Sequence, residues 1–280
     1  MASPRPSDFT LGGDGSLALY RRLIDARVRA DLTYRFSFAL RVLSAMLVTA
    51  LDYVAIWALM SKVKTIGGWD RWQVTYLYGA SSVAFRAADA FIGGPVERCS
   101  QYVRVGTFDT FLVRPRSALL QVLGHDFALR RVGQLAAMVP FLVIALAHLH
   151  IIWSVGKVLF LIAQLLGAAL LFSAVFVIVS CLAFWSPESR EIANAFTYGG
   201  ATVAEYPVHA MASWIRSLTF TIVPVAFTAY FPAFVVFDAP NPLGVPRWVS
   251  YASPLACVPV GLLAVVVWRF AVRRYRSTGS

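Results

Sequence analysis

The sequence predicts an all-α polytopic membrane protein with six transmembrane helices, an N-terminal amphipathic elbow helix, a cytoplasmic coupling helix and a re-entrant segment before the last span. Of its 280 residues, 59% are hydrophobic and the mean hydropathy is +0.67, which is too apolar for a soluble domain. A helix of about 20 residues crosses a hydrocarbon core of about 30 Å. The apolar blocks that reach this length are 36–60, 72–93, 132–152, 157–184, 215–237 and 252–270.

The basic residues lie on alternate connections between these blocks. One side carries Arg5, Arg21, Arg22, Arg27, Arg29, Arg35, Arg98, Arg104, Arg114, Arg116, Arg130, Arg131, Arg190, Arg216, Arg269, Arg273, Arg274 and Arg276. The other side carries Lys62, Lys64, Arg71, Lys157 and Arg247. Because positive residues stay on the cytoplasmic side, this pattern predicts a multi-pass protein of the cell inner (plasma) membrane with both termini cytoplasmic.

Two segments precede the first block. Residues 1–15 are polar and rich in Gly, Pro and Ser, without the apolar core of a signal peptide, so we expect a disordered tail. Residues 16–35 place apolar side chains at helical spacing, with arginines on the opposite face. Directly before a span, this pattern predicts an elbow helix in the headgroup plane. Residues 16–275 are expected to form one transmembrane permease domain.

Three charged residues lie well inside the predicted spans. Asp52 is in the first block, and Arg86 and Asp89 are in the second, three positions apart on one helical face. A charge within the bilayer is a functional hypothesis by default. Two interpretations stay open for Arg86 and Asp89: a structural ion pair or interface contact, and a proton relay or substrate contact.

The connection 94–131 is too long for a simple turn. Phe108, Phe111 and Leu112 share one face, with Asp109 opposite, and a second amphipathic helix follows Pro115. This predicts a helix–turn–helix at the cytoplasmic membrane surface. It is either a plain interfacial loop or a docking surface for a cytoplasmic partner.

The later connections are less regular. Residues 185–214 are expected to form a second cytoplasmic connection with a short helix around 189–197. Pro224 and Pro232 should kink or break the fifth block. The proline-rich stretch that follows it is expected to re-enter the membrane in part.

Motifs that would indicate an enzyme are absent from the sequence. It contains no GxxxxGK[ST] loop, no HExxH and no GxSxG, so we expect no catalytic residues and no cofactor bound by this chain. Its three cysteines are far apart, and no spacing predicts a metal site. The formal net charge of +11 is attributed to a face that meets anionic membrane lipids rather than nucleic acid.

The sequence resembles the membrane permease subunit of type-2 ABC exporters. The resemblance rests on Gly106-Thr-Phe-Asp-Thr-Phe-Leu-Val-Arg-Pro115, on Glu205-Tyr-Pro207, and on the proline-broken segment from Ile222 to Pro232. It implies a six-span permease that pairs with a second permease, either an identical copy or a paralogue. It also implies a separate ATP-binding ATPase subunit, which would hold the ATP and Mg.

The resemblance also assigns roles to residues. The first cytoplasmic loop would be the coupling helix that docks on the ATPase. Carried onto this chain, the coupling region would contain Arg104, Phe108, Asp109, Phe111, Arg114 and Pro115.

Two other functions compete with this interpretation. An ion- or proton-coupled secondary transporter would use Asp52, Arg86 and Asp89, but such carriers normally show internal repeats, and we find no related halves. An integral-membrane enzyme acting on lipids would need a catalytic cluster that the sequence does not show.

The missing phosphate-binding loop gives a direct prediction. The purified chain should not hydrolyse ATP, because it has no Gly-rich loop to hold the phosphates. Release of phosphate from ATP measures this, and robust turnover by the pure chain would contradict the permease interpretation.

Overall fold

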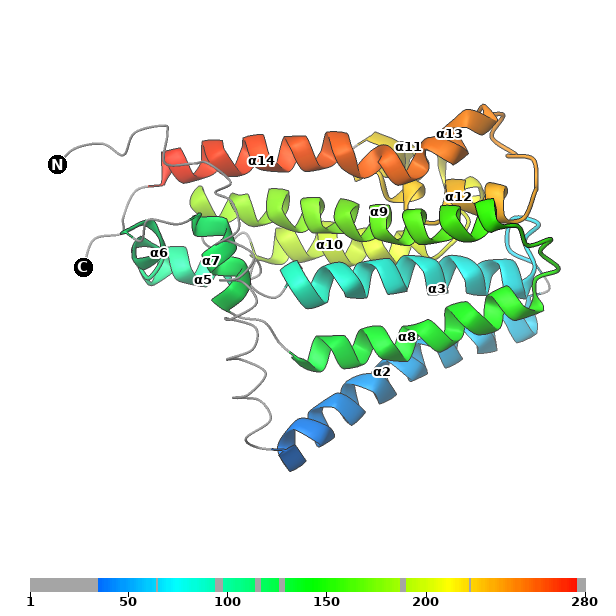
Figure 1. Ribbon diagram of the computed structural model, residues 1–280, viewed down its shortest axis with the longest axis horizontal. Helices are drawn as coiled ribbons and strands as arrows, with labels where there is room; N and C mark the ends of the chain where they lie inside the picture. Colours follow the sequence, from blue (N-terminus) through cyan, green and yellow to red (C-terminus); the bar gives the residue numbers. More distant parts are fainter. Residues whose placement is uncertain are drawn as a thin grey trace.

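The computed structural model describes residues 35–63, 65–93, 98–113, 117–125, 129–186, 190–221 and 223–275. The predicted tail and elbow helix lie outside these residues, except for Arg35. Within them the chain folds as a bundle of helices (Figure 1). The long elements are α2 (Arg35–Lys62), α3 (Arg71–Ala88), α8 (Leu129–His148), α9 (Val155–Ser180), α10 (Arg190–Ala204) and α14 (Cys257–Arg274). The short ones are η2 (Asp89–Gly93), α5 (Cys99–Arg104), α6 (Asp109–Val113), α7 (Ala118–His125), η3 (Cys181–Phe184), η4 (Val208–Ala210), α11 (Ser213–Thr221), η5 (Val225–Phe227), α12 (Tyr230–Val236), α13 (Arg247–Ala252) and η6 (Ser253–Ala256).

Helix α3 is the centre of the bundle. It begins with a capping box, in which the Asp70 side chain accepts from the backbone N–H of Gln73 and the Gln73 side chain accepts from the N–H of Asp70. Most of its residues from Val74 onward are buried. A Cβ at Gly79 would lie 2.8 Å from the Cα of Leu142, so glycine lets α3 and α8 cross closely.

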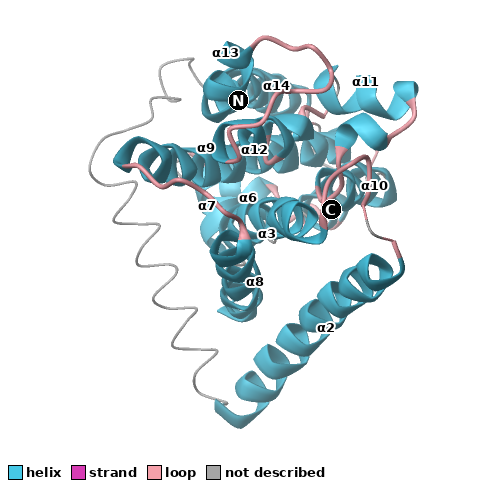
Figure 2. Ribbon diagram, turned by 90° about the vertical axis from the view of Figure 1, so that its right-hand side faces the viewer, coloured by secondary structure: helices cyan, strands magenta, loops and turns pink. Residues whose placement is uncertain are grey.

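Helix α2 lies at the edge of the bundle and packs on α8 (Figure 2). A Cβ at Gly133 of α8 would approach Val42 to 2.7 Å, so a small residue again allows the contact. Much of the remaining surface of α2 is apolar and exposed, including Leu43, Leu47 and Leu51. Such a surface suits contact with lipid or with another membrane protein.

Within the described residues, three helices are long and apolar enough to cross a membrane: Arg131–His148, Val155–Phe184 and Arg247–Arg274. The segments Ser213–Thr221 and Val225–Val236 together make a fourth candidate, bent by 76°. The predicted break in the fifth block is therefore confirmed, and Pro224 stands at it. Pro232 lies in the first turn of α12, where proline is tolerated.

The segment that follows α10 lies at the end of the bundle opposite to the one that the sequence predicted. His209 places Nε2 2.6 Å from the carbonyl oxygen of Gly67, in the loop between α2 and α3, and Nδ1 3.0 Å from the hydroxyl of Tyr230. That loop is at the opposite end of α3 from α5 (Figure 1). The prediction that all of 185–214 lies on the same side as 94–131 is thus wrong. The helix expected around 189–197 begins at Arg190 and extends to Ala204; it continues through Gly199 and Gly200, and the next proline is Pro207.

The bent segment turns back inside the bundle. Val223 and Val225 lie against Gly200 of α10, and the amide nitrogen of Gln164 donates to the carbonyls of Phe227 and Thr228, at 2.9 and 2.6 Å. Gln164 is fully buried and about 14 Å along α9 from its start. Irregular backbone at this depth needs partners within the protein, and Gln164 supplies them.

These two hydrogen bonds predict that the side-chain amide of Gln164 contributes substantially to the free energy of unfolding. Gln164→Leu should lower the free energy of unfolding by about 1–3 kcal/mol, because it leaves two buried carbonyls without a donor. Thermal unfolding in detergent measures the change. Ser173→Ala is the matched control in the same helix, since Ser173 only bonds back to the Ala169 carbonyl. Equal melting temperatures for the two variants would contradict the assignment.

Candidate functional site

The loop that connects α3 to α8 folds as a unit of three short helices at one end of the bundle (Figure 1). After α5, Gly106 adopts a φ of 75°, a left-handed conformation that glycine accepts without strain. This turn brings the N–H of Phe108 to 3.1 Å from the carbonyl of Tyr102. Helix α6 then begins at Asp109. The expected helix–turn–helix is therefore a three-helix unit, α5, α6 and α7.

Phe108 anchors the loop to the ends of the long helices. Its side chain is 0% exposed, and its ring centroid lies 5.0 Å from that of Phe184, 5.1 Å from that of Tyr275 and 6.4 Å from that of Trp268. Burial of an aromatic side chain contributes several kcal/mol of stability. The loop is thereby fixed to α14 and to the end of α9.

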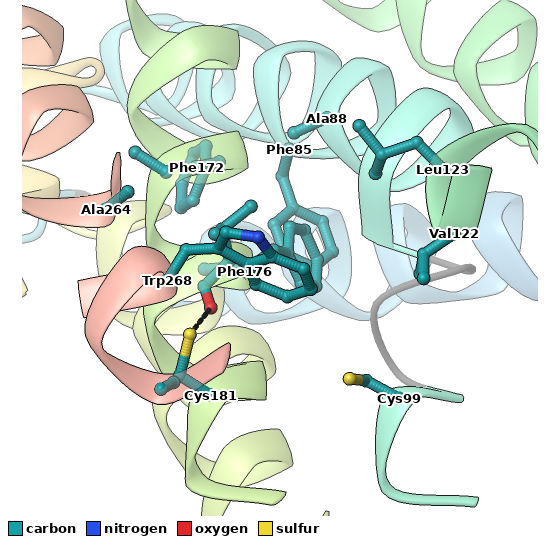
Figure 3. Close-up of a cluster of buried hydrophobic side chains, with 14 of the residues drawn as sticks. Phe85, Ala88, Cys99, Val122, Leu123, Phe172, Phe176, Cys181, Ala264 and Trp268 are labelled. Carbon is teal, nitrogen blue, oxygen red and sulfur yellow. Dashed lines mark hydrogen bonds between the residues drawn. The ribbon is translucent and has the colours of Figure 1, made fainter. Parts of the chain in front are cut away.

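The same aromatic cluster continues into the bundle. Figure 3 shows Trp268 of α14 close to Phe172 and Phe176 of α9 and to Phe85 of α3. The rings of Phe85 and Phe172 meet edge to face at 5.3 Å. Displacement of the loop would therefore disturb packing on three long helices.

The aromatic side chains of α6 and of the residue before it are buried inside the chain, so they cannot contact a partner. Phe108 and Phe111 were expected to form a ridge directed at another protein, but both are buried within the chain. Gln121 of α7 donates from Nε2 to the carbonyl of Phe111 at 3.1 Å, which ties α6 to α7. The expectation failed because the amphipathic pattern is the same whether a face packs on a partner or on the chain itself.

A different surface of the loop is exposed. It consists of exposed residues of α5, of α6 and of the turn between them, and Val113 is 84% exposed. Its described members are Arg104, Val105, Thr107, Thr110, Leu112 and Val113. Arg114 and Pro115, which the sequence also placed in the coupling region, lie outside the described residues.

Asp109 lies at the inner edge of this surface and is half-buried. Burial, and then the neighbouring Asp109 carboxylate, raise the pKa of the Tyr275 phenol to about 12. The phenol therefore stays protonated at neutral pH. Burial likewise raises the pKa of the Cys99 thiol to about 12, which keeps the thiol protonated at neutral pH.

The charges within the predicted spans are arranged differently from expectation. The carboxylate of Asp89 forms an ion pair with Arg131 at the start of α8, not with Arg86. The guanidinium of Arg86 lies over the ring of Phe85, 5.8 Å from its centroid. Asp52 is in α2. Helical spacing indicated Arg86 as the partner, and no local pattern reveals a contact across 42 residues.

The structure contains an apolar pocket that the sequence did not predict. It has a volume of about 320 Å³ and lies between α10 and α11. Its lining is formed by Ala195, Phe196, Gly199, Gly200, Val203, Trp214, Ile215, Leu218, Thr219, Val223 and Val225.

The described part of the chain holds no group of three or more His, Cys, Asp or Glu side chains that could bind a metal ion.

The anchoring role of Phe108 can be tested by truncation. Phe108→Ala should cost about 3–5 kcal/mol locally and free the loop from α14. Hydrogen exchange of the backbone between residues 98 and 125 should accelerate. Leu112→Ala, at an exposed position of α6 four residues further on, is the control and should change exchange little. Unaltered exchange in Phe108→Ala would show that the aromatic cluster does not hold the loop.

Comparison with known proteins gives one match. A family model described as "ABC-2 family transporter protein" matches residues 46–279, which is most of the chain. No curated protein and no solved structure matches the chain significantly.

Proposed function

Because the chain belongs to the ABC-2 transporter family and is a multi-pass membrane permease of an ABC transporter, we propose that it forms half of the substrate path of an ATP-driven exporter. In this proposal it docks a separate ATPase through the loop between α3 and α8. The observation that carries the docking assignment is the three-helix unit itself. It is held to the bundle by buried aromatic rings and keeps Val113, Leu112 and Arg104 on its outer surface.

The proposal divides the work between subunits. The chain would contribute no catalytic residue, and the ATP and Mg would belong to the ATPase. A loop that is packed against α3, α9 and α14 can transmit a displacement to them, because closely packed helices move together as a rigid body. A second permease, identical or paralogous, would complete the path.

We propose a membrane topology that differs from the predicted one in its fifth crossing. The six crossings would be α2, α3, α8, α9, α10 with its extension to His209, and α14. Residues 210–237 would then enter from the outer side and return to it. Two contacts at the same end of the bundle support this layout: His209 with Gly67, and Asp238 with Lys157 at the start of α9.

The orientation follows from the basic residues. Under the revised topology Arg216 lies on the outer side with Lys157 and Arg247. The other basic residues of the connections keep the sides that the sequence predicts, so most of them stay on the cytoplasmic side. Both termini and the docking loop would be cytoplasmic, in the inner (plasma) membrane. An aspartate paired with arginine, as Asp89 is, suits a structural role better than the proton relay of a secondary transporter.

The docking surface can be tested by placing charge on it. Val113→Asp and Arg104→Glu should each weaken binding of the ATPase by about tenfold, because they alter the apolar and charged character of the exposed surface. Binding is measured by titration of the ATPase onto the chain in nanodiscs.

A matched control position lies at the opposite end of the helical bundle. Ile152 is 81% exposed in the loop between α8 and α9, much as Val113 is in the docking loop. Ile152→Asp should bind the ATPase as the wild type does. If Val113→Asp and Ile152→Asp bound equally well, the loop would not be the docking site.

A further inference from the structure

The two ends of the docking loop are joined by an ion pair. Asp89 is the first residue of η2, the wide turn that ends α3, and Arg131 is in the first turn of α8. All of α5, α6 and α7 lies in the chain between them. One guanidinium nitrogen of Arg131 donates to both the carboxylate and the main-chain carbonyl of Asp89, the latter at 3.2 Å.

The surroundings of the pair are built to hold it. The side chains of Asp89 and Arg131 are 4% and 12% exposed, so solvent screens their attraction little. A Cβ at Gly93 would come within 2.5 Å of the Asp89 carboxylate and 3.0 Å of the Phe176 ring. Only glycine at this position leaves room for the carboxylate to fold back toward Arg131. Wide helical turns of this type occur frequently at functional sites.

The pair and the aromatic cluster fasten the loop at different places. Phe108 holds the middle of the loop to α14 and η3, whereas Arg131 holds its base to the end of α3. With the base closed, the end of α3 and the start of α8 should stay together when the loop is pushed, beyond the close crossing of these helices at Gly79 and Leu142. With the base open, the loop could shift while one of these helices stayed in place.

We propose that Asp89 and Arg131 are positioning residues that clamp the base of the docking loop, so that movement of the loop reaches α3 and α8 together. The proposal rests on the docking function of the loop given above. The pair does not contact the ATPase or the substrate; it acts through the helices that it joins. Its effect is therefore on transmission and not on binding.

The test uses the full chain in nanodiscs with spin labels at Gln101→Cys in α5 and Ala136→Cys in α8, both exposed positions. Cys99 and Cys181 are buried, and Cys257 is replaced by serine. In the wild-type pair, the distance between the labels should have a narrow distribution. Asp89→Asn should widen it at least about twofold, and so should Arg131→Gln, because either exchange breaks the ion pair that joins the end of α3 to the start of α8.

A charge swap separates positioning from simple stability. Asp89→Arg combined with Arg131→Asp should recover a narrower distribution than either single exchange gives. Asp238→Asn is the matched control, since it removes the Lys157 ion pair at the opposite end of the bundle and should leave the distribution unchanged. A distribution in Asp89→Asn as narrow as in the wild type would overturn the proposal, and so would a width equal to that in Asp238→Asn.

The second readout uses the partner ATPase. Asp89→Asn should bind it within about twofold of the wild type, yet reduce by at least about threefold any change in ATP hydrolysis that the wild-type chain causes. Normal regulation of hydrolysis by this variant would overturn the transmission role. Failure of the wild-type chain to bind an ATPase would instead count against the docking function, and the distance measurement on the chain alone would still decide whether the clamp exists.

Discussion

The structure depends on one constraint: polar groups inside an apolar bundle must find their partners within the chain. Two buried long-range contacts meet it, and a third joins a loop to the end of the bundle. Gln164 donates to the irregular backbone at Phe227, and Arg131 pairs with Asp89. His209 contacts the carbonyl of Gly67 in the exposed loop between α2 and α3. Each joins segments that are far apart in sequence. Together they determine where the segment after α10 lies, how the bent segment returns and how the loop between α3 and α8 is closed.

The same constraint explains how a loop at one end could act on the whole bundle. Phe108 is buried against the ends of α14 and α9, and the Asp89–Arg131 pair closes the loop at its base. A loop held at two places transmits displacement, whereas a loop held at its ends alone would absorb it. The exposed residues of α5 and α6 are then free to meet a partner.

The sequence predicted the helical class and the position of most long helices, because the length of an apolar block can be read along the chain. It predicted the family through the resemblance carried by segments such as Gly106–Pro115. It placed the break at Pro224 correctly. It misassigned the residues around His209, since a helix of moderate hydropathy such as α10 looks like a loop beside stronger blocks. It also paired Asp89 with Arg86, because spacing along one helix is visible in a sequence and a contact with Arg131 is not.

The loop between α3 and α8 is proposed to bind a separate ATPase. Photo-crosslinking in native membranes tests it directly, with a photoreactive amino acid at Val113 and, in a parallel strain, at Ile152. We expect the product formed at Val113 to contain an ATP-binding protein and the product formed at Ile152 to contain none. An ATPase captured at Ile152, or none captured at Val113, would show that the ATPase does not bind at this loop.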